Sequence, residues 1–167
     1  MTGPDLRNTN LPRGLRNNNP FNLVKTSISW QGKVIGSDPR FETFQNLGFG
    51  IRAGLLDLYN DWARKNLKTI KSLITEFAPP SENLTGNYIN FVSARTGIAP
   101  DRPLQLPDLV KVAQAIVILE NGQVPQTEQA AAMVPAVAVQ LPQYGEAAKP
   151  GVNVPLLAAL ALIASGL

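Results

Sequence analysis

Residues 108–122 read DLVKVAQAIVILENG, and this stretch decides the fold that the sequence predicts. Its apolar residues return at intervals of three and four, which is typical of a helix with a broad buried face. Asp108 is a suitable N-cap, and Gly122 is the kind of residue that ends a helix. We therefore expect a helix from about Asp108 to Gly122. The apolar residues that mark this helix are Leu109, Val112, Ala113, Ile116, Val117 and Leu119.

Three segments before this stretch show the same spacing of apolar residues. We expect one helix over about 48–64, a second over 67–77 and a third over about 81–97. Two consecutive prolines separate the second helix from the third. Residues 21–44 instead alternate over short distances, which favours one small β-hairpin.

The composition divides the chain into three parts. Residues 1–12 are polar and contain Pro and Gly, so an extended N-terminal arm is expected. Residues 13–123 carry the predicted helices and hairpin, which makes this domain mainly α (α+β). Residues 124–167 carry few charges and form an apolar, Ala-, Val- and Pro-rich tail. Three alternatives are open for the tail: packing on its own domain or a neighbouring subunit, association with lipid, and disorder.

Missing residue types exclude several functions. The chain contains no His and no Cys, so it builds no disulfide, thiolate nucleophile, Ser-His-Asp triad or His/Cys metal site. Acid-base chemistry must therefore use carboxylates, and we expect no metal or other cofactor. The formal net charge is +3, but no basic run is interleaved with aromatic residues, so nucleic acid is not an expected partner. The polar N-terminus predicts no secretory signal.

Glu120 is the most informative single residue. It continues the apolar stripe formed by Leu109, Ala113 and Ile116, which directs its carboxyl group toward the buried side of the helix. Apolar surroundings disfavour the anion, and the negative end of the helix dipole repels it. A carboxylic acid that keeps its proton can act as the general acid of a glycosidase. The alternative is that the side chain turns outward into water.

A second polar cluster lies in the stretch NNNPFN, residues 17–22. Its amides suit sugar hydroxyl and acetamido groups, and Trp30 and Tyr88 would offer apolar faces to sugar rings. The alternative is an Asn-rich turn that caps its own chain. Glu42 is expected to be solvated, and Glu82 is expected in the first turn of a helix, where a carboxylate stabilises the dipole.

Six ordered segments resemble a family of short phage and prophage proteins classed as virion structural proteins. They are RGLRNNNPFN, SWQG, RFETF, LGFGIRAGLLDLY, FAPPSEN and AIVILENGQ, and together they span roughly Pro12 to Gln123. The resemblance is strongest to membrane-containing, corticovirus-like phages, whose virions enclose a lipid layer. It implies synthesis in the host cytoplasm, a place in the virion, other virion proteins as partners, and possible lipid contact through the tail.

A looser resemblance suggests a mechanism. NNPFN, WQG, an aromatic pair and a long amphipathic helix resemble the part of bacterial cell-wall glucosaminidases and lysozyme-like enzymes that follows their catalytic glutamate. AIVILENGQ resembles the end of the helix that carries this glutamate, although here it comes last, as in a circular permutation. The resemblance implies a lysozyme-like domain that acts on peptidoglycan. Glu120 would be the general acid, with a groove lined by Asn18, Asn19, Asn22 and Trp30.

Two hypotheses about function follow from these resemblances. In the first, the chain cleaves host peptidoglycan locally as the phage penetrates the cell, with Glu82 or Glu42 as a second carboxylate. If neither faces Glu120, a single-acid transglycosylase route is favoured over two-carboxylate hydrolysis. In the second, the chain is a non-enzymatic virion protein with the same fold. An open groove at Glu120, facing Asn22 or Glu82, would favour the first hypothesis.

Overall fold

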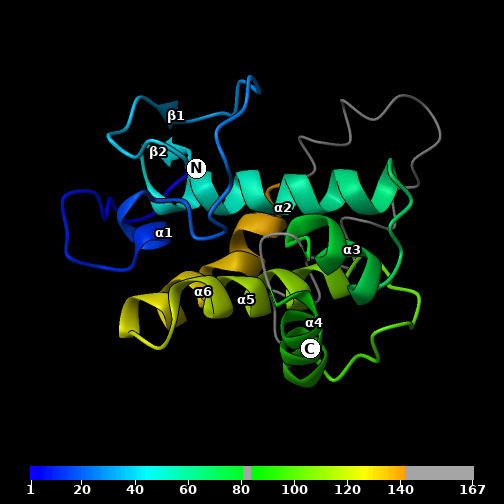
Figure 1. Cartoon of the computed structure of the whole chain (residues 1–167). Coiled ribbons are helices and arrows are strands. Elements are labelled where there is room, and N and C mark those ends of the chain that lie inside the picture. Colours follow the sequence, from blue (N-terminus) through cyan, green and yellow to red (C-terminus); the bar gives the residue numbers. More distant parts are fainter. Residues whose placement is uncertain (81–83, 142–167) are drawn as a thin grey trace.

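The computed structural model describes residues 1–80 and 84–141 and confirms a mainly α fold with a small antiparallel hairpin (Figure 1). The hairpin consists of β1 (Lys33–Val34) and β2 (Thr43–Phe44). The helices in the described part of the chain are α1 (Arg13–Arg16), α2 (Leu47–Ala63), α3 (Ile70–Phe77), α4 (Thr85–Thr96), α5 (Asp108–Asn121) and α6 (Pro125–Ala138).

The buried core is built around α5. This helix contacts α1, α2, α4 and α6. Along α2, one end lies beside α1 and the hairpin, and the other end lies beside α3 and α4 (Figure 1). Val112, Ala113 and Ile116 have no exposed surface, as the spacing of apolar residues predicts. Leu119, by contrast, is 37% exposed.

Side-chain caps fix where α2 and α3 begin. Asn46 precedes α2, and its side-chain oxygen accepts a hydrogen bond from the backbone N–H of Phe49. Thr69 precedes α3 and forms a capping box with Ser72. The third expected helix begins at Thr85, later than the sequence indicates, and α5 begins at Asp108 with Pro107 in the N-cap position.

One short strand pair and one isolated bridge form the hairpin region. In the register of β1 and β2, Lys33 lies opposite Phe44 and Val34 opposite Thr43. One isolated bridge joins Val24 to Phe41. Backbone hydrogen bonds outside the strands also hold this region: the Glu42 N–H donates to the carbonyl of Leu23 at 2.9 Å, and the Phe44 N–H donates to the carbonyl of Asn17 at 3.0 Å. Side chains add further hydrogen bonds to these.

The N-terminal arm packs on the beginning of α2. The carbonyl of Pro4 accepts a hydrogen bond from the N–H of Leu47 at 2.9 Å, and the Asn46 amide donates to the carbonyl of Met1. A Cβ at Gly48 would lie 2.1 Å from the carbonyl oxygen of Thr2, so a glycine is required where the arm crosses the helix. The arm therefore covers the first turn of α2.

The beginning of the tail forms α6, a helix that the sequence did not predict. Its residues Ala130, Val134 and Val137 are buried, and α6 packs on α5 and α2. Pro125 occupies the first turn, where the missing N–H costs nothing. This part of residues 124–167 thus packs on its own domain, and residues 142–167 lie outside the described part of the chain. No helix among the described residues is long and apolar enough to cross a membrane.

The buried carboxyl group of Asp57 on α2 should make the free energy of unfolding depend on pH. Burial, followed by repulsion from Asp61, raises the pKa of Asp57 to about 6. The folded chain therefore binds this proton more tightly than the unfolded chain, and stability falls as pH rises from about 4 to above 6. We expect Asp57→Asn to raise the free energy of unfolding by about 2 kcal/mol at pH 7.5 and to change it little at pH 4.

Urea unfolding at both pH values measures this difference. Asp101→Asn serves as the control, because the Asp101 side chain is 77% exposed and its removal should have little effect at either pH. An equal change in stability at pH 4 and pH 7.5 for Asp57→Asn would contradict the prediction.

Candidate functional site

The carboxyl group of Glu120 lies at the last turn of α5, between two side-chain donors. Its Oε2 accepts a hydrogen bond from Asn22 Nδ2 at 2.7 Å, and its Oε1 accepts one from the Tyr88 hydroxyl at 2.8 Å. Glu120 is partly buried and does not simply extend into water. The fold therefore brings together three residues that are far apart in sequence.

Tyr88 is positioned by the packing of α3 against α4. Its side chain is buried, and its ring meets the ring of Phe77 edge-on with centroids 6.2 Å apart. Burial and the neighbouring Glu120 carboxylate raise the pKa of Tyr88. The hydroxyl thus stays protonated and remains a donor to Glu120.

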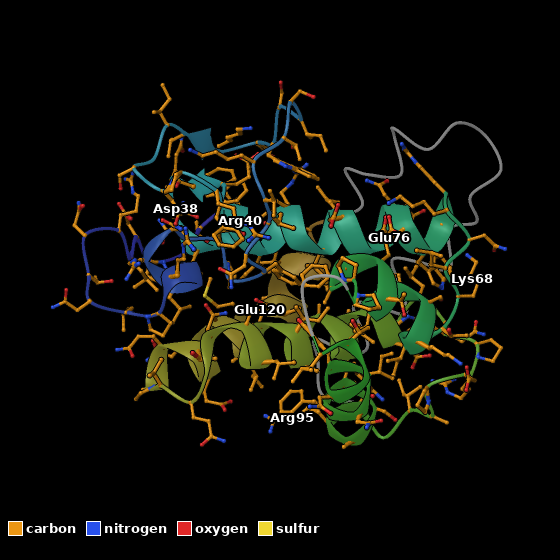
Figure 2. All side chains as sticks on the ribbon, in the orientation of Figure 1. Asp38, Arg40, Lys68, Glu76, Arg95 and Glu120 are labelled. Atoms are coloured by element: carbon orange, nitrogen blue, oxygen red, sulfur yellow. The ribbon has the colours of Figure 1, made fainter. Side chains whose placement is uncertain are left out.

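An open cleft of about 380 Å³ lies in front of Glu120. Besides Glu120 and Asn22 it is lined by Phe21, Val24, Arg40, Phe41 and Phe77. Figure 2 shows Glu120 on the side of α5 that faces the loop bearing Asp38 and Arg40. Within residues 1–80 and 84–141, Glu120 is the only carboxylate that lines this cleft.

Asp38 holds the loop that carries Arg40 and Phe41. It accepts two hydrogen bonds from the Arg13 guanidinium, at 2.7 and 2.8 Å, and one from the Asn17 amide at 2.8 Å. The backbone N–H groups of Arg40 and Phe41 also donate to Asp38, each at 2.9 Å. The Arg13 guanidinium holds the pKa of Asp38 well below its usual range. Asp38 thus sets the position of one wall of the cleft.

Asn121 ties residues 17–22 to the end of α5. Its Nδ2 donates to the carbonyl of Pro20 at 2.7 Å and to the carbonyl of Val117 at 2.8 Å. A Cβ at Gly14 would lie 2.3 Å from Asn121 Oδ1, so α1 approaches this closely only because residue 14 is glycine. Asn22 has a φ of 50°, a left-handed conformation that Asn tolerates well. These constraints aim the Asn22 amide at Glu120.

One curated protein matches over most of the chain. The chain is 40% identical over 119 residues to Protein P5 of Pseudoalteromonas phage PM2, which covers 69% of this chain and 74% of that protein. The chain belongs to the Protein P5 family. This kinship confirms the relationship to a corticovirus-like phage and supports a place in the virion. No family model matches the chain.

Two predicted sugar-binding residues of this P5-family chain lie outside the cleft. Asn18 and Asn19 have no exposed surface. Asn18 donates to Asp5 and to the carbonyl of Phe44, and Asn19 donates to the carbonyls of Leu23 and Glu42. The Asn19 amide therefore holds the turn and the Asn18 amide also binds the N-terminal arm, which is the structural alternative that the Asn-rich composition left open.

Three other predicted residues have different surroundings. Trp30 is partly buried against the core and does not line the cleft. The expectation that Glu42 is solvated is wrong: it is 1% exposed and accepts hydrogen bonds from Lys33 Nζ and the Thr26 N–H. The alternation of buried and exposed side chains does not apply to Glu42, because the neighbouring strand β2 is only two residues long. Glu82 lies outside the described residues.

Besides Phe21 and Val24, the sequence interpretation missed three residues of the cleft, namely Arg40, Phe41 and Phe77. Two of them lie in RFETF and one opens FAPPSEN, so the segments were recognised although the roles of these side chains were not. No group of acidic side chains in the described ranges, 1–80 and 84–141, is arranged to hold a metal ion.

Asp38→Asn tests the positioning of the cleft wall. The variant leaves the Arg13 guanidinium without its charged partner, so we expect a loss of about 2 kcal/mol of stability at pH 7. Because the folded pKa of Asp38 is depressed, its contribution is present above pH 4 and is lost as pH falls through the folded pKa. The difference between wild type and variant should shrink in acid.

Urea unfolding at pH 7 and pH 3 measures the effect. Asp5→Asn is the matched control, since Asp5 forms the same kind of pair with Arg7 in a far more exposed setting. An effect of Asp38→Asn no larger than that of Asp5→Asn would show that Asp38 does not hold the loop.

Proposed function

We propose that this chain is a component of a phage virion and that the Glu120 cleft cleaves host peptidoglycan locally as the phage penetrates the cell. The bond cut is the glycosidic bond between N-acetylmuramic acid and N-acetylglucosamine. The observation that carries the proposal is the Glu120 carboxyl group, held by Asn22 and Tyr88 and facing an open cleft. Other virion proteins are the expected partners, and residues 142–167 are the segment proposed for lipid contact.

The walls of the cleft suit a carbohydrate chain. Phe41 and Phe77 supply aromatic surface on which the apolar face of a sugar ring packs. Arg40 and Asn22 supply donors for hydroxyl, acetamido and carboxylate oxygens. A cleft of about 380 Å³ that is open to solvent admits part of a polymer without requiring a chain end.

The partners of Glu120 accommodate both of its protonation states. The Tyr88 hydroxyl donates to the carboxylate, and by rotating it accepts from the carboxylic acid. The Oδ1 atom of Asn22 is buried and has no hydrogen-bond partner among the described residues. A rotated Asn22 amide would present this oxygen to a protonated Glu120. A group that gives up a proton and later regains one needs such neighbours.

The proposed reaction uses Glu120 twice. Its carboxylic acid protonates the glycosidic oxygen, the bond from C1 to that oxygen breaks, and the electron pair leaves with the departing sugar. The resulting carboxylate then removes a proton from the hydroxyl that attacks C1. Because no second carboxylate among the described residues lines the cleft, attack by the sugar's own C6 hydroxyl is favoured over two-carboxylate hydrolysis. Glu82 is kept as the candidate for a second carboxylate.

A structural role for Glu120 is the second candidate function. Each of its two oxygens is bonded to a side chain of the same protein, and these bonds join α5 to α4 and to residues 17–22. In this case the chain is a non-enzymatic virion protein whose cleft is a by-product of the fold.

Release of soluble fragments from purified Gram-negative peptidoglycan decides between the two. We expect the full chain to release fragments, and Glu120→Gln to reduce the rate by about 10²- to 10⁴-fold, because glutamine cannot transfer the proton. Glu128→Gln is the matched control, since Glu128 is exposed on α6 away from the cleft. Mass spectrometry of the products distinguishes anhydro-sugar ends from reducing ends, and a Glu82→Gln protein tests the second carboxylate.

Two results would count against the enzyme. Equal rates for wild type and Glu120→Gln would remove Glu120 from the chemistry. No release by a folded wild-type protein would favour the non-enzymatic virion protein.

Tyr88→Phe separates positioning of Glu120 from simple packing. The variant keeps the ring against Phe77 and loses only the hydroxyl that donates to Glu120. We expect about a tenfold lower rate and a shift in the pH dependence of the rate, because one hydrogen bond to the carboxylate is lost. An unchanged pH profile, with lower thermal stability alone, would indicate that Tyr88 is a structural partner.

A further inference from the structure

A second cavity, of about 490 Å³, lies between the N-terminal arm, α1 and the hairpin. None of the residues that line it also lines the Glu120 cleft. The two are connected through Asp38, which binds Asn17 of the second cavity and the backbone of Arg40 and Phe41 in the cleft. The second cavity is therefore separate from the Glu120 cleft, and Asp38 contacts the walls of both.

The second cavity is rich in cationic and polar groups. Its lining includes the guanidinium groups of Arg7 and Arg16 and the polar side chains of Asn17 and Ser37, and no Asp or Glu among the described residues lines it. Arg7 forms an ion pair with Asp5 at 2.6 Å. Arg16 is exposed and has no carboxylate partner in the described ranges 1–80 and 84–141. Its guanidinium is thus available to a ligand.

Thr43 closes the cavity on the side of the hairpin. Its side chain is 4% exposed and packs on Gly36, where an added Cβ would lie 2.0 Å from Thr43 Oγ1. This hydroxyl has no exposed surface and no hydrogen-bond partner among the described residues, so it does not reach the open space of the cavity. The hairpin register, which places Thr43 opposite Val34, fixes this residue in the wall.

We propose that this cavity binds a sugar that carries an oxyanion, either a carboxylate or a phosphate. The planar guanidinium of Arg16 pairs with such a group through two parallel hydrogen bonds. Asn8, Thr9 and Ser37 supply polar side chains for the hydroxyl groups of the ring. The volume is within the range of small-molecule sites and exceeds what a free ion needs.

This proposal does not rest on cleavage of peptidoglycan. It concerns binding alone, at residues other than Glu120, so the two proposals can fail separately. The anionic sugar of the bacterial wall, N-acetylmuramic acid, is one source of the required chemistry, and a phosphorylated sugar is the other.

Titration calorimetry of the full chain tests the site with four probes. These are N-acetylmuramic acid, N-acetylglucosamine 6-phosphate, uncharged N-acetylglucosamine and inorganic phosphate. We expect saturable binding of at least one anionic sugar, at least tenfold tighter than that of the uncharged sugar, because a charge-assisted pair with Arg16 is gained. The probe that binds more tightly identifies the source of the oxyanion.

Variants assign the binding to the second cavity. Arg16→Gln should weaken the anionic sugar about tenfold, whereas Arg64→Gln, which removes the same charge after the end of α2, should not. Thr43→Val should leave the affinity unchanged, because the Thr43 hydroxyl packs on Gly36 and has no exposed surface. Glu128→Gln, which changes an exposed side chain on α6, should bind as wild type does.

Several results would overturn the proposal. They are the absence of saturable binding by either anionic sugar, equal binding of charged and uncharged sugars, and equal binding by wild type and Arg16→Gln. Binding of inorganic phosphate as tight as that of the phosphorylated sugar would also overturn it, because the ring would then contribute nothing. Loss of binding in Glu120→Gln alone would place the sugar in the Glu120 cleft.

Discussion

The contact between residues 17–22 and the last turn of α5 is the interaction on which the candidate site depends. Asn121 fastens the carbonyl of Pro20 to α5, one residue after Glu120, and Gly14 leaves the space for this approach. With the loop fixed in this way, the Asn22 amide reaches the Glu120 carboxyl group at 2.7 Å. A displaced loop would withdraw the fully buried Phe21 from the core, and the cleft would lose the wall opposite α5.

The asparagines of this loop have different hydrogen-bonding roles. Asn18 and Asn19 bond mainly to backbone groups and complete the hydrogen bonding of a turn that short strands cannot satisfy. Asn17 binds Asp38 and thereby links the loop to the opposite wall of the cleft. Only Asn22 directs its amide at Glu120. An Asn-rich segment is thus both a structural cap and part of a site, and the two alternatives raised by its composition apply to different residues.

The sequence predicts well which side chains lie on the buried face of a single helix. Periodicity is enough to bury Val112 and Ile116 and to turn Glu120 inward, because side chains on one helix face follow from spacing alone. It predicts poorly what packing between elements decides. Asp38 and Arg40 act through partners elsewhere in the chain, which no local pattern reveals. The helix α6 was missed because its Ala-rich segment contains an internal proline and lacks the usual polar face.

The distribution of charge relates the site to a kind of ligand. The Glu120 cleft contains Arg40, and the second cavity contains Arg7 and Arg16, while Asp38 beside them is already occupied by Arg13. Asp38 repels an anionic polymer only weakly, because the neighbouring Arg13 guanidinium compensates its negative charge. Under the proposed function, these arginines are the cationic groups that an anionic strand of a bacterial wall would meet. Within the described cleft, Glu120 is the single acid such a strand would meet, and its two donors disperse that charge.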